Sequence, residues 1–112
     1  MGPLQGIKIL EFSGIGPGPY CGMLLADLGA DVIRLNRKDQ KGVENKYDIH
    51  NRSKRSITAD LKDPNVTEQI LNLIKQMDVV FEGFRPGVME KLGLGPEDCL
   101  KINESLVYGR MT

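Results

Sequence analysis

Residues 6–37 read GIKILEFSGIGPGPYCGMLLADLGADVIRLNR, and this stretch decides the fold. An apolar run over residues 7–12 comes first and is followed by a loop of glycines and prolines. An amphipathic segment and a second apolar run, residues 31–35, come next. This order predicts a strand, a loop, a helix and a second strand, the unit that opens many parallel α/β sheets. Sheets of this kind bind nucleotide-like ligands at the carboxyl ends of their strands.

The first predicted helix carries an apolar stripe. Cys21, Leu24, Leu25 and Leu28 recur at the spacing of one helix face, so we expect this face to pack on the sheet. Gly29 is expected to end the helix, because glycine readily adopts the backbone conformation found after a helix C-cap.

The rest of the chain continues the alternation of strands and helices. Further strands are expected over residues 56–61, 78–84 and 106–111, with a polar loop over 38–51. Asp63 and Pro64 predict the N-cap and first turn of a helix. The apolar residues of that helix follow at helical spacing: Val66, Ile70, Leu73, Ile74 and Met77. Short helices are expected over residues 86–92 and 96–102.

This pattern predicts an α/β fold, a Rossmann-like and mostly parallel sheet with flanking helices. A parallel strand is normally followed by a covering helix, yet this chain ends at or just after its fifth strand. We therefore expect the sheet to be truncated there, and the chain to be the front part of a longer protein.

Composition narrows the function classes. The 112 residues contain 15 basic and 15 acidic side chains and no Trp, which argues against a nucleic-acid partner. No apolar run approaches the roughly 20 residues that span a bilayer, so no membrane partner is expected. Cys21 and Cys99 are far apart and are expected to be reduced thiols of a cytoplasmic protein. His50 is the only histidine, and no metal site is expected.

The glycine loop resembles a dinucleotide fingerprint but does not match it. Gly14 and Gly16 begin the G-x-G-x-x-G pattern, and Pro19 occupies the third glycine position. Each proline also removes a backbone N–H that could bind a pyrophosphate. The loop either brings the backbone close to a different ligand or is only a tight turn that packs the helix on the sheet.

Basic residues gather from the end of the second predicted strand to just after the third. They include Arg34, Arg37, Lys38, Arg52, Lys54, Arg55 and Lys62. Near strand ends, such side chains suit a small polyphosphate ligand, because arginine binds phosphate as a planar fork. An ordinary solvated face is the alternative.

Two carboxylates, Glu11 and Glu82, lie near the carboxyl ends of predicted strands. A pair there could act as acid and base, although such residues more often cap loops or pair with arginines. Ser13 lies outside any nucleophile-elbow motif and has no histidine near it in sequence.

Four motifs in order resemble the class III coenzyme A transferase family of the CaiB/BaiF type, and most closely its α-methylacyl-CoA racemase branch. They are PLQGIKILEF at 3–12, GPGPYCGMLLADLGADVIRL at 16–35, KRSITADLK at 54–62 and DVVFEGFRPGVMEKLGLGPE at 78–97. The resemblance covers nearly the whole chain except the 38–51 loop. It implies that residues 1–112 are the N-terminal, Rossmann-like, coenzyme A-binding segment of a longer enzyme of fatty acid metabolism.

The resemblance also implies site residues by position. The nucleotide end of coenzyme A would lie at Arg37. The positions that would contact coenzyme A are Gly16, Pro17, Arg37, Ala59, Lys62, Gly83, Phe84, Arg85 and Lys91. Transferases usually carry Asn where this chain has Gly83. The family's catalytic residues lie downstream of Thr112, so no catalytic residue is expected in this chain and the segment alone is expected to be inactive.

Three functions stay open on these grounds. The first is an α-methylacyl-CoA racemase, an isomerase that moves the α-proton of an acyl-CoA substrate and requires no further cofactor. The second is a class III transferase that passes coenzyme A between carboxylic acids. Both would be interlocked homodimers as full-length enzymes. The third is a non-catalytic nucleotide-binding module, which would be a monomer without an exposed apolar patch.

Overall fold

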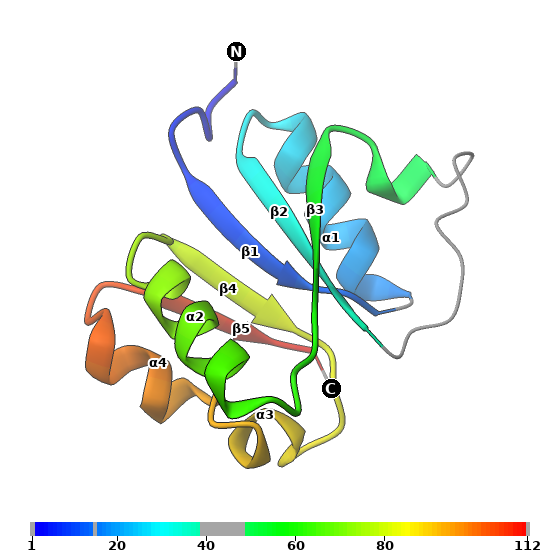
Figure 1. The fold of residues 1–112 in the computed structure, drawn as a ribbon. Helices are drawn as coiled ribbons and strands as arrows, with labels where there is room; N and C mark the ends of the chain where they lie inside the picture. Colours follow the sequence, from blue (N-terminus) through cyan, green and yellow to red (C-terminus); the bar gives the residue numbers. More distant parts are fainter. Residues whose placement is uncertain (1, 15, 39–48, 112) are drawn as a thin grey trace.

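Five parallel strands form the sheet of the computed structural model, which describes residues 2–14, 16–38 and 49–111 (Figure 1). They are β1 (Lys8–Phe12), β2 (Asp31–Arg37), β3 (Lys54–Ala59), β4 (Val79–Glu82) and β5 (Val107–Arg110). Their order across the sheet is β3-β2-β1-β4-β5, and each neighbouring pair is parallel. The α/β, Rossmann-like sheet expected from the sequence is therefore confirmed.

Helices cover both faces of this sheet (Figure 1). Helix α1 (Pro17–Asp27) lies on one face, here called the α1 face. Helices α2 (Pro64–Ile74) and α4 (Pro96–Ile102) cover the opposite face, the α2 face. The short helix α3 (Val88–Lys91) follows β4, and the 3₁₀ turn η1 (Ile49–Asn51) packs against α1.

Each central strand supplies both cores, because side chains alternate across a pleated strand. On the α1 face, Ile9, Val32 and Phe81 pack with Ala26 and Ala30. On the α2 face, the buried cluster includes Leu10, Phe12, Leu35, Val80, Ile70, Ile74 and Met89. This two-sided burial explains why residues 7–12 are an almost continuous apolar run.

The α2 helix forms as the sequence predicts. The Asp63 side chain accepts a hydrogen bond from the backbone N–H of Asn65 at 2.9 Å, and Pro64 occupies the first turn. Ile70 and Ile74 are buried, and Met77 lies in the same core just beyond the helix.

The predicted packed face of α1 is confirmed only in part: Cys21 and Leu25 pack against the core of the α1 face, whereas Leu24 and Leu28 do not. Leu24 and Leu28 are 43% and 45% exposed, and the buried residues of α1 are Gly18, Pro19, Gly22, Met23 and Ala26. Small residues let the helix backbone approach the sheet closely, which turns the larger leucines outward. With Tyr20, which is 51% exposed, Leu24 and Leu28 form an exposed apolar stripe spaced by one helix turn.

Several boundaries also differ from the predicted ones. β2 runs on to Arg37, β3 spans 54–59 rather than 56–61, and β4 ends at Glu82. Of the expected loop at 38–51, residues 39–48 lie outside the described residues. In the part of the chain that the structure describes, no helix has the length and apolar character needed to cross a bilayer.

Candidate functional site

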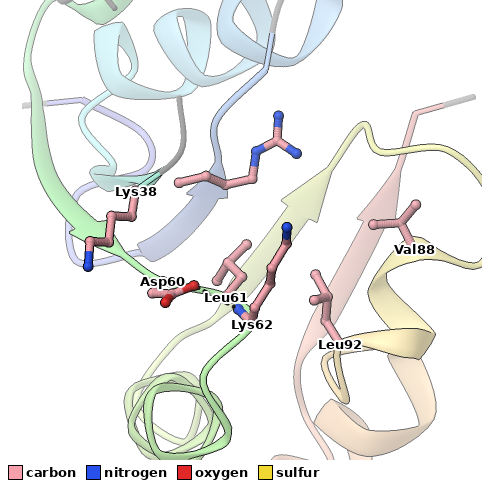
Figure 2. Close-up of a pocket in the computed structure, with 7 residues that line it drawn as sticks. Lys38, Asp60, Leu61, Lys62, Val88 and Leu92 are labelled. Atoms are coloured by element: carbon pink, nitrogen blue, oxygen red, sulfur yellow. Dashed lines mark hydrogen bonds between the residues drawn. The ribbon is translucent and has the colours of Figure 1, made fainter. Parts of the chain in front are cut away.

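A groove of about 420 Å³ opens at the carboxyl edge of the sheet, on the α2 face (Figure 2). We call it the Arg37 groove. It is lined by Arg37, Lys38, Asp60, Leu61, Lys62, Val88 and Leu92. These residues come from the end of β2, the segment after β3, and α3 with its C-cap. Ligands of open α/β sheets bind at this edge.

The groove combines an apolar wall with cations. Leu61, Val88 and Leu92 supply the apolar surface, and Arg37 and Lys62 supply positive charge. In Figure 2 the side chain of Lys38 points away from Lys62 and from α3. The side chain of Asp60 accepts a hydrogen bond from the backbone N–H of Lys62 at 3.1 Å, so this carboxylate stabilises the turn after β3.

Within residues 2–14, 16–38 and 49–111, backbone pairing and an aromatic ring hold Arg37 in place. It pairs in register with Ala59, whose carbonyl accepts from the N–H of Lys38 at 2.9 Å. Its guanidinium carbon lies 5.1 Å from the ring centroid of Phe84, a cation–π contact. Its buried Nε has no hydrogen-bond partner among the residues that the structure describes. Buried N–H donors are normally hydrogen-bonded, so a ligand acceptor that reached this nitrogen would satisfy it.

Phe84 is itself fixed from two sides. Its ring meets the ring of Phe12 edge to face, with centroids 6.1 Å apart. Its backbone N–H donates to the Glu82 carboxylate at 3.0 Å. The segment after β4 therefore supports the Arg37 groove through Phe84.

The two candidate carboxylates do not form an acid–base pair. Glu11 is in register with Phe81, so Glu82, the next residue of β4, points to the opposite face of the sheet. Glu82 is buried and accepts from the Arg110 Nε at 2.8 Å as well as from Phe84. Arg110 also donates to Glu90, and these hydrogen bonds lower the pKa of the Glu90 carboxyl.

Glu11 lies on the α1 face and pairs with Lys54. The Lys54 Nζ lies 2.8 Å from one carboxylate oxygen and donates to the other at 3.1 Å. The same ammonium donates to the Pro19 carbonyl at 3.0 Å, in the first turn of α1. Burial raises the pKa of Glu11, and the hydrogen bond from Lys54 opposes part of this rise. Both carboxylates therefore pair with basic side chains. This is the alternative that the sequence left open to an acid–base pair.

The residues implied by the resemblance are distributed over this edge of the sheet. Arg37 and Lys62 line the Arg37 groove, and Ala59 and Phe84 contact or pair with Arg37. Gly16 is the N-cap of α1 at φ 81°, and Pro17 is its first residue. A Cβ atom on Gly83 would lie 3.8 Å from the Met111 side chain. Arg85 and Lys91 are exposed and lie outside the groove lining.

Sequence reasoning missed part of the groove and its support. Val88 and Leu92, one helix turn apart, form much of the apolar wall, and their i, i+4 spacing was the available signal. Arg110 and Glu90 were missed because they lie 20 residues apart in sequence.

The two cysteines are free thiols. Cys99 is buried, its Sγ donates to the Leu94 carbonyl at 3.4 Å, and burial raises its pKa to about 11. Cys21 is half-buried, and burial raises its pKa as well. Among residues 2–14, 16–38 and 49–111, no three His, Cys, Asp or Glu side chains are grouped so as to hold a metal ion.

Comparison with known proteins identifies a family. The profile of CoA-transferase family III matches residues 4–112. Human alpha-methylacyl-CoA racemase is 46% identical over 111 residues, which cover 97% of this chain and 28% of that protein. Formyl-CoA:oxalate CoA-transferase of Afipia carboxidovorans is 39% identical over 116 residues, covering 93% of this chain and 27% of that protein.

A solved structure agrees with these sequence matches. The crystal structure of the hypothetical protein Rv3272 from Mycobacterium tuberculosis superposes with a TM-score of 0.89 at 40% identity. The superposition covers 100% of this chain and 34% of that one. The chain thus spans about a third or less of the length of these relatives.

Proposed function

The chain belongs to CoA-transferase family III, and from that premise we propose that the Arg37 groove binds the nucleotide end of coenzyme A. One observation carries the proposal: the Arg37 guanidinium rests on Phe84, while its buried Nε has no hydrogen-bond partner in the described part of the chain. A phosphate oxygen of the ligand would accept from this Nε. Charge-assisted bonds from arginine to phosphate are among the stronger hydrogen bonds in proteins.

The chemistry of the groove walls supports this ligand. Coenzyme A combines phosphates with an adenine ring, and the groove combines Arg37 and Lys62 with the apolar surfaces of Leu61, Val88 and Leu92. Pockets that fix a ligand by a few polar groups within a mainly apolar wall are typical of cofactor sites. Further contacts are assigned to residues around the same edge of the sheet: Gly16, Pro17, Ala59, Gly83, Phe84, Arg85 and Lys91.

For the whole protein we propose the activity of an α-methylacyl-CoA racemase. The 46% identity with the human racemase supports this choice. The reaction would remove the α-proton of a 2-methylacyl-CoA thioester and return it to either face of the resulting enolate. Residues 1–112 would bind and orient the coenzyme A moiety. The thioester would then be held against catalytic groups that lie outside these residues. The reaction would require no cofactor apart from the coenzyme A moiety of the substrate itself. The enzyme would act as a homodimer in the cytoplasm.

Transfer of coenzyme A between carboxylic acids is the second candidate. The 39% identity with the Afipia formyl-CoA:oxalate CoA-transferase favours it. In the longer protein, incorporation of solvent deuterium at the α-carbon of a 2-methylacyl-CoA would identify the racemase. Formation of a new acyl-CoA from a free carboxylate would identify the transferase. Residues 1–112 alone are expected to show neither reaction.

A non-catalytic module is less well supported. That function predicted a chain without exposed apolar patches, whereas Tyr20, Leu24 and Leu28 form an exposed apolar stripe on α1.

Calorimetry with two ligands tests the proposed site. Coenzyme A and pantetheine share the thiol arm, and only coenzyme A carries the nucleotide and its phosphates. The chain should bind coenzyme A and show a much weaker affinity for pantetheine. Equal affinity for the two ligands would contradict a site for the nucleotide end.

A further inference from the structure

Arg110, the last residue of β5, joins two segments that support the Arg37 groove. Its Nε donates to the Glu82 carboxylate at 2.8 Å. Its Nη1 and Nη2 donate to the two carboxylate oxygens of Glu90 at 2.9 Å and 2.6 Å. The three side chains differ in exposure: 33% for Arg110, 2% for Glu82 and 50% for Glu90. One guanidinium therefore links a buried acid of β4 to an exposed acid of α3.

The buried end of this network holds Phe84. One Glu82 oxygen binds Arg110, and the other accepts from the Phe84 N–H at 3.0 Å. The Phe84 ring in turn lies beneath the Arg37 guanidinium, at 5.1 Å. A continuous series of contacts thus runs from Arg110 through Glu82 and Phe84 to Arg37.

The exposed end holds α3. This helix has only four residues, Val88–Lys91, and a helix so short depends on tertiary contacts for its stability. Met89 anchors it in the core, and the two bonds from Arg110 to Glu90 tie its outer side to β5. Val88, within α3, and Leu92, its C-cap, line the Arg37 groove.

Arginine is required for this geometry. The planar guanidinium offers Nε to one carboxylate and both Nη atoms to another in a fixed fork. A lysine at this position would keep the charge but would lack the planar fork that binds the Glu90 carboxylate through two nitrogens while Nε binds Glu82.

We propose that Arg110 is a positioning residue for the Arg37 groove, which fixes Phe84 and α3 through Glu82 and Glu90. Its effect on a ligand rests on the proposed coenzyme A site, whereas its effect on Phe84 and Arg37 does not. Arg110 itself lies outside the groove lining. Loss of its two contacts would loosen the Phe84 N–H bond and the Phe84–Arg37 contact.

The test compares Arg110→Lys with a matched control, Arg55→Lys. Arg55 also donates to a carboxylate, that of Asp31, through two nitrogens. This ion pair is exposed and has no contact with Phe84 or α3. In ligand-free protein, we expect Arg110→Lys to shift the Arg37 Nε–H resonance, which the Phe84 ring current influences. Hydrogen exchange of the Phe84 amide should be at least about fivefold faster. Arg55→Lys should change neither.

Calorimetry then measures the consequence for the ligand. Arg110→Lys should weaken coenzyme A binding by about five- to tenfold, in the range of couplings between neighbouring groups, and Arg55→Lys should leave it unchanged. If Arg110→Lys does not fold, Glu90→Gln, which keeps the buried Glu82–Arg110 pair, should change both measurements in the same direction to a smaller extent.

An Arg37 resonance and a Phe84 exchange rate identical to those of the wild type would overturn the positioning role. Unchanged coenzyme A affinity in Arg110→Lys would overturn its effect on the ligand. A wild-type chain that binds no coenzyme A would instead contradict the proposed function, and the two ligand-free measurements would still decide the role of Arg110.

Discussion

The ammonium nitrogen of Lys54 lies 2.8 Å from a carboxylate oxygen of Glu11, and the side chains are 1% and 0% exposed. The pair joins the first residue of β3 to β1, and the Lys54 bond to the Pro19 carbonyl adds the first turn of α1. Three elements of the α1 face thus meet at one buried ion pair.

Replacing Lys54 with Met should destabilise the fold strongly. The substitution leaves Glu11 buried without its partner, and breaking a buried pair from one side typically costs about 3–5 kcal/mol. Urea unfolding followed by circular dichroism measures the change. Arg55→Met, which removes the exposed pair with Asp31, is the control and should have little effect. An equal decrease in the free energy of unfolding in the two variants would contradict a larger contribution of the buried pair to stability.

Gly22 is expected to tolerate no side chain. A Cβ atom there would lie 1.8 Å from the Glu11 Oε1 and 2.9 Å from the Lys54 Nζ. Gly22→Ala must therefore displace the buried pair, and overpacking of this kind costs about 1–3 kcal/mol. Gly18, also buried in α1, is the matched control, since its nearest contact would be the Met111 Sδ at 4.0 Å. Thermal unfolding should show a clear loss for Gly22→Ala and little change for Gly18→Ala.

Glu11 should make stability depend on pH in a defined direction. Burial raises its pKa above the ordinary value of 4.5 despite the opposing hydrogen bond from Lys54. The folded state therefore retains the proton to higher pH than the unfolded state. The stabilisation from this group is complete below about pH 4.5 and is lost as the pH rises through the raised, folded-state pKa.

Unfolding of the wild type and Glu11→Gln over a pH series measures this effect, because glutamine does not titrate. The free energy of unfolding of the wild type should fall relative to that of Glu11→Gln as the pH rises above about 4.5. If the free energy of unfolding of the wild type instead rises relative to that of Glu11→Gln over the same pH range, the Lys54 interaction outweighs burial.

The two thiols should differ in reactivity. Cys99 is buried with a pKa of about 11, so about one molecule in a thousand carries the thiolate at pH 8. In native protein at pH 8, an aromatic disulfide reagent should modify the half-buried Cys21 first and leave Cys99 protected. The variant Cys21→Ser should abolish the early phase, and Cys99→Ala should retain it. Rapid modification of Cys99 in the folded protein would contradict its burial.

The sequence predicted the sheet because the relevant signals are local. Apolar runs identified β1, β2 and β4, and Asp63 with Pro64 identified the start of α2. Hydrophobic periodicity correctly placed Cys21 and Leu25 against the core but wrongly added Leu24 and Leu28. It gave no weight to Gly18 and Gly22, whose small size lets the helix approach the sheet.

The site was partly predictable for a related reason. Arg37 and Lys62 follow strands, and the carboxyl ends of parallel strands share one edge of the sheet, so their convergence could be expected. The link from Arg110 to Glu82 and Glu90 depends on the pairing of β4 with β5 and on the placement of α3. No local pattern in the sequence specifies these two relationships together.

Removal of the Arg37 side chain tests the central claim most directly. Calorimetric titration with coenzyme A should be compared for the wild type, Arg37→Ala and Arg55→Ala, the last removing a cation from the same basic segment outside the groove. We expect Arg37→Ala to bind about tenfold or more weakly, as for loss of a charge-assisted contact with phosphate, while Arg55→Ala binds like the wild type. Equal affinity of Arg37→Ala and the wild type would contradict the assignment of the Arg37 groove to coenzyme A.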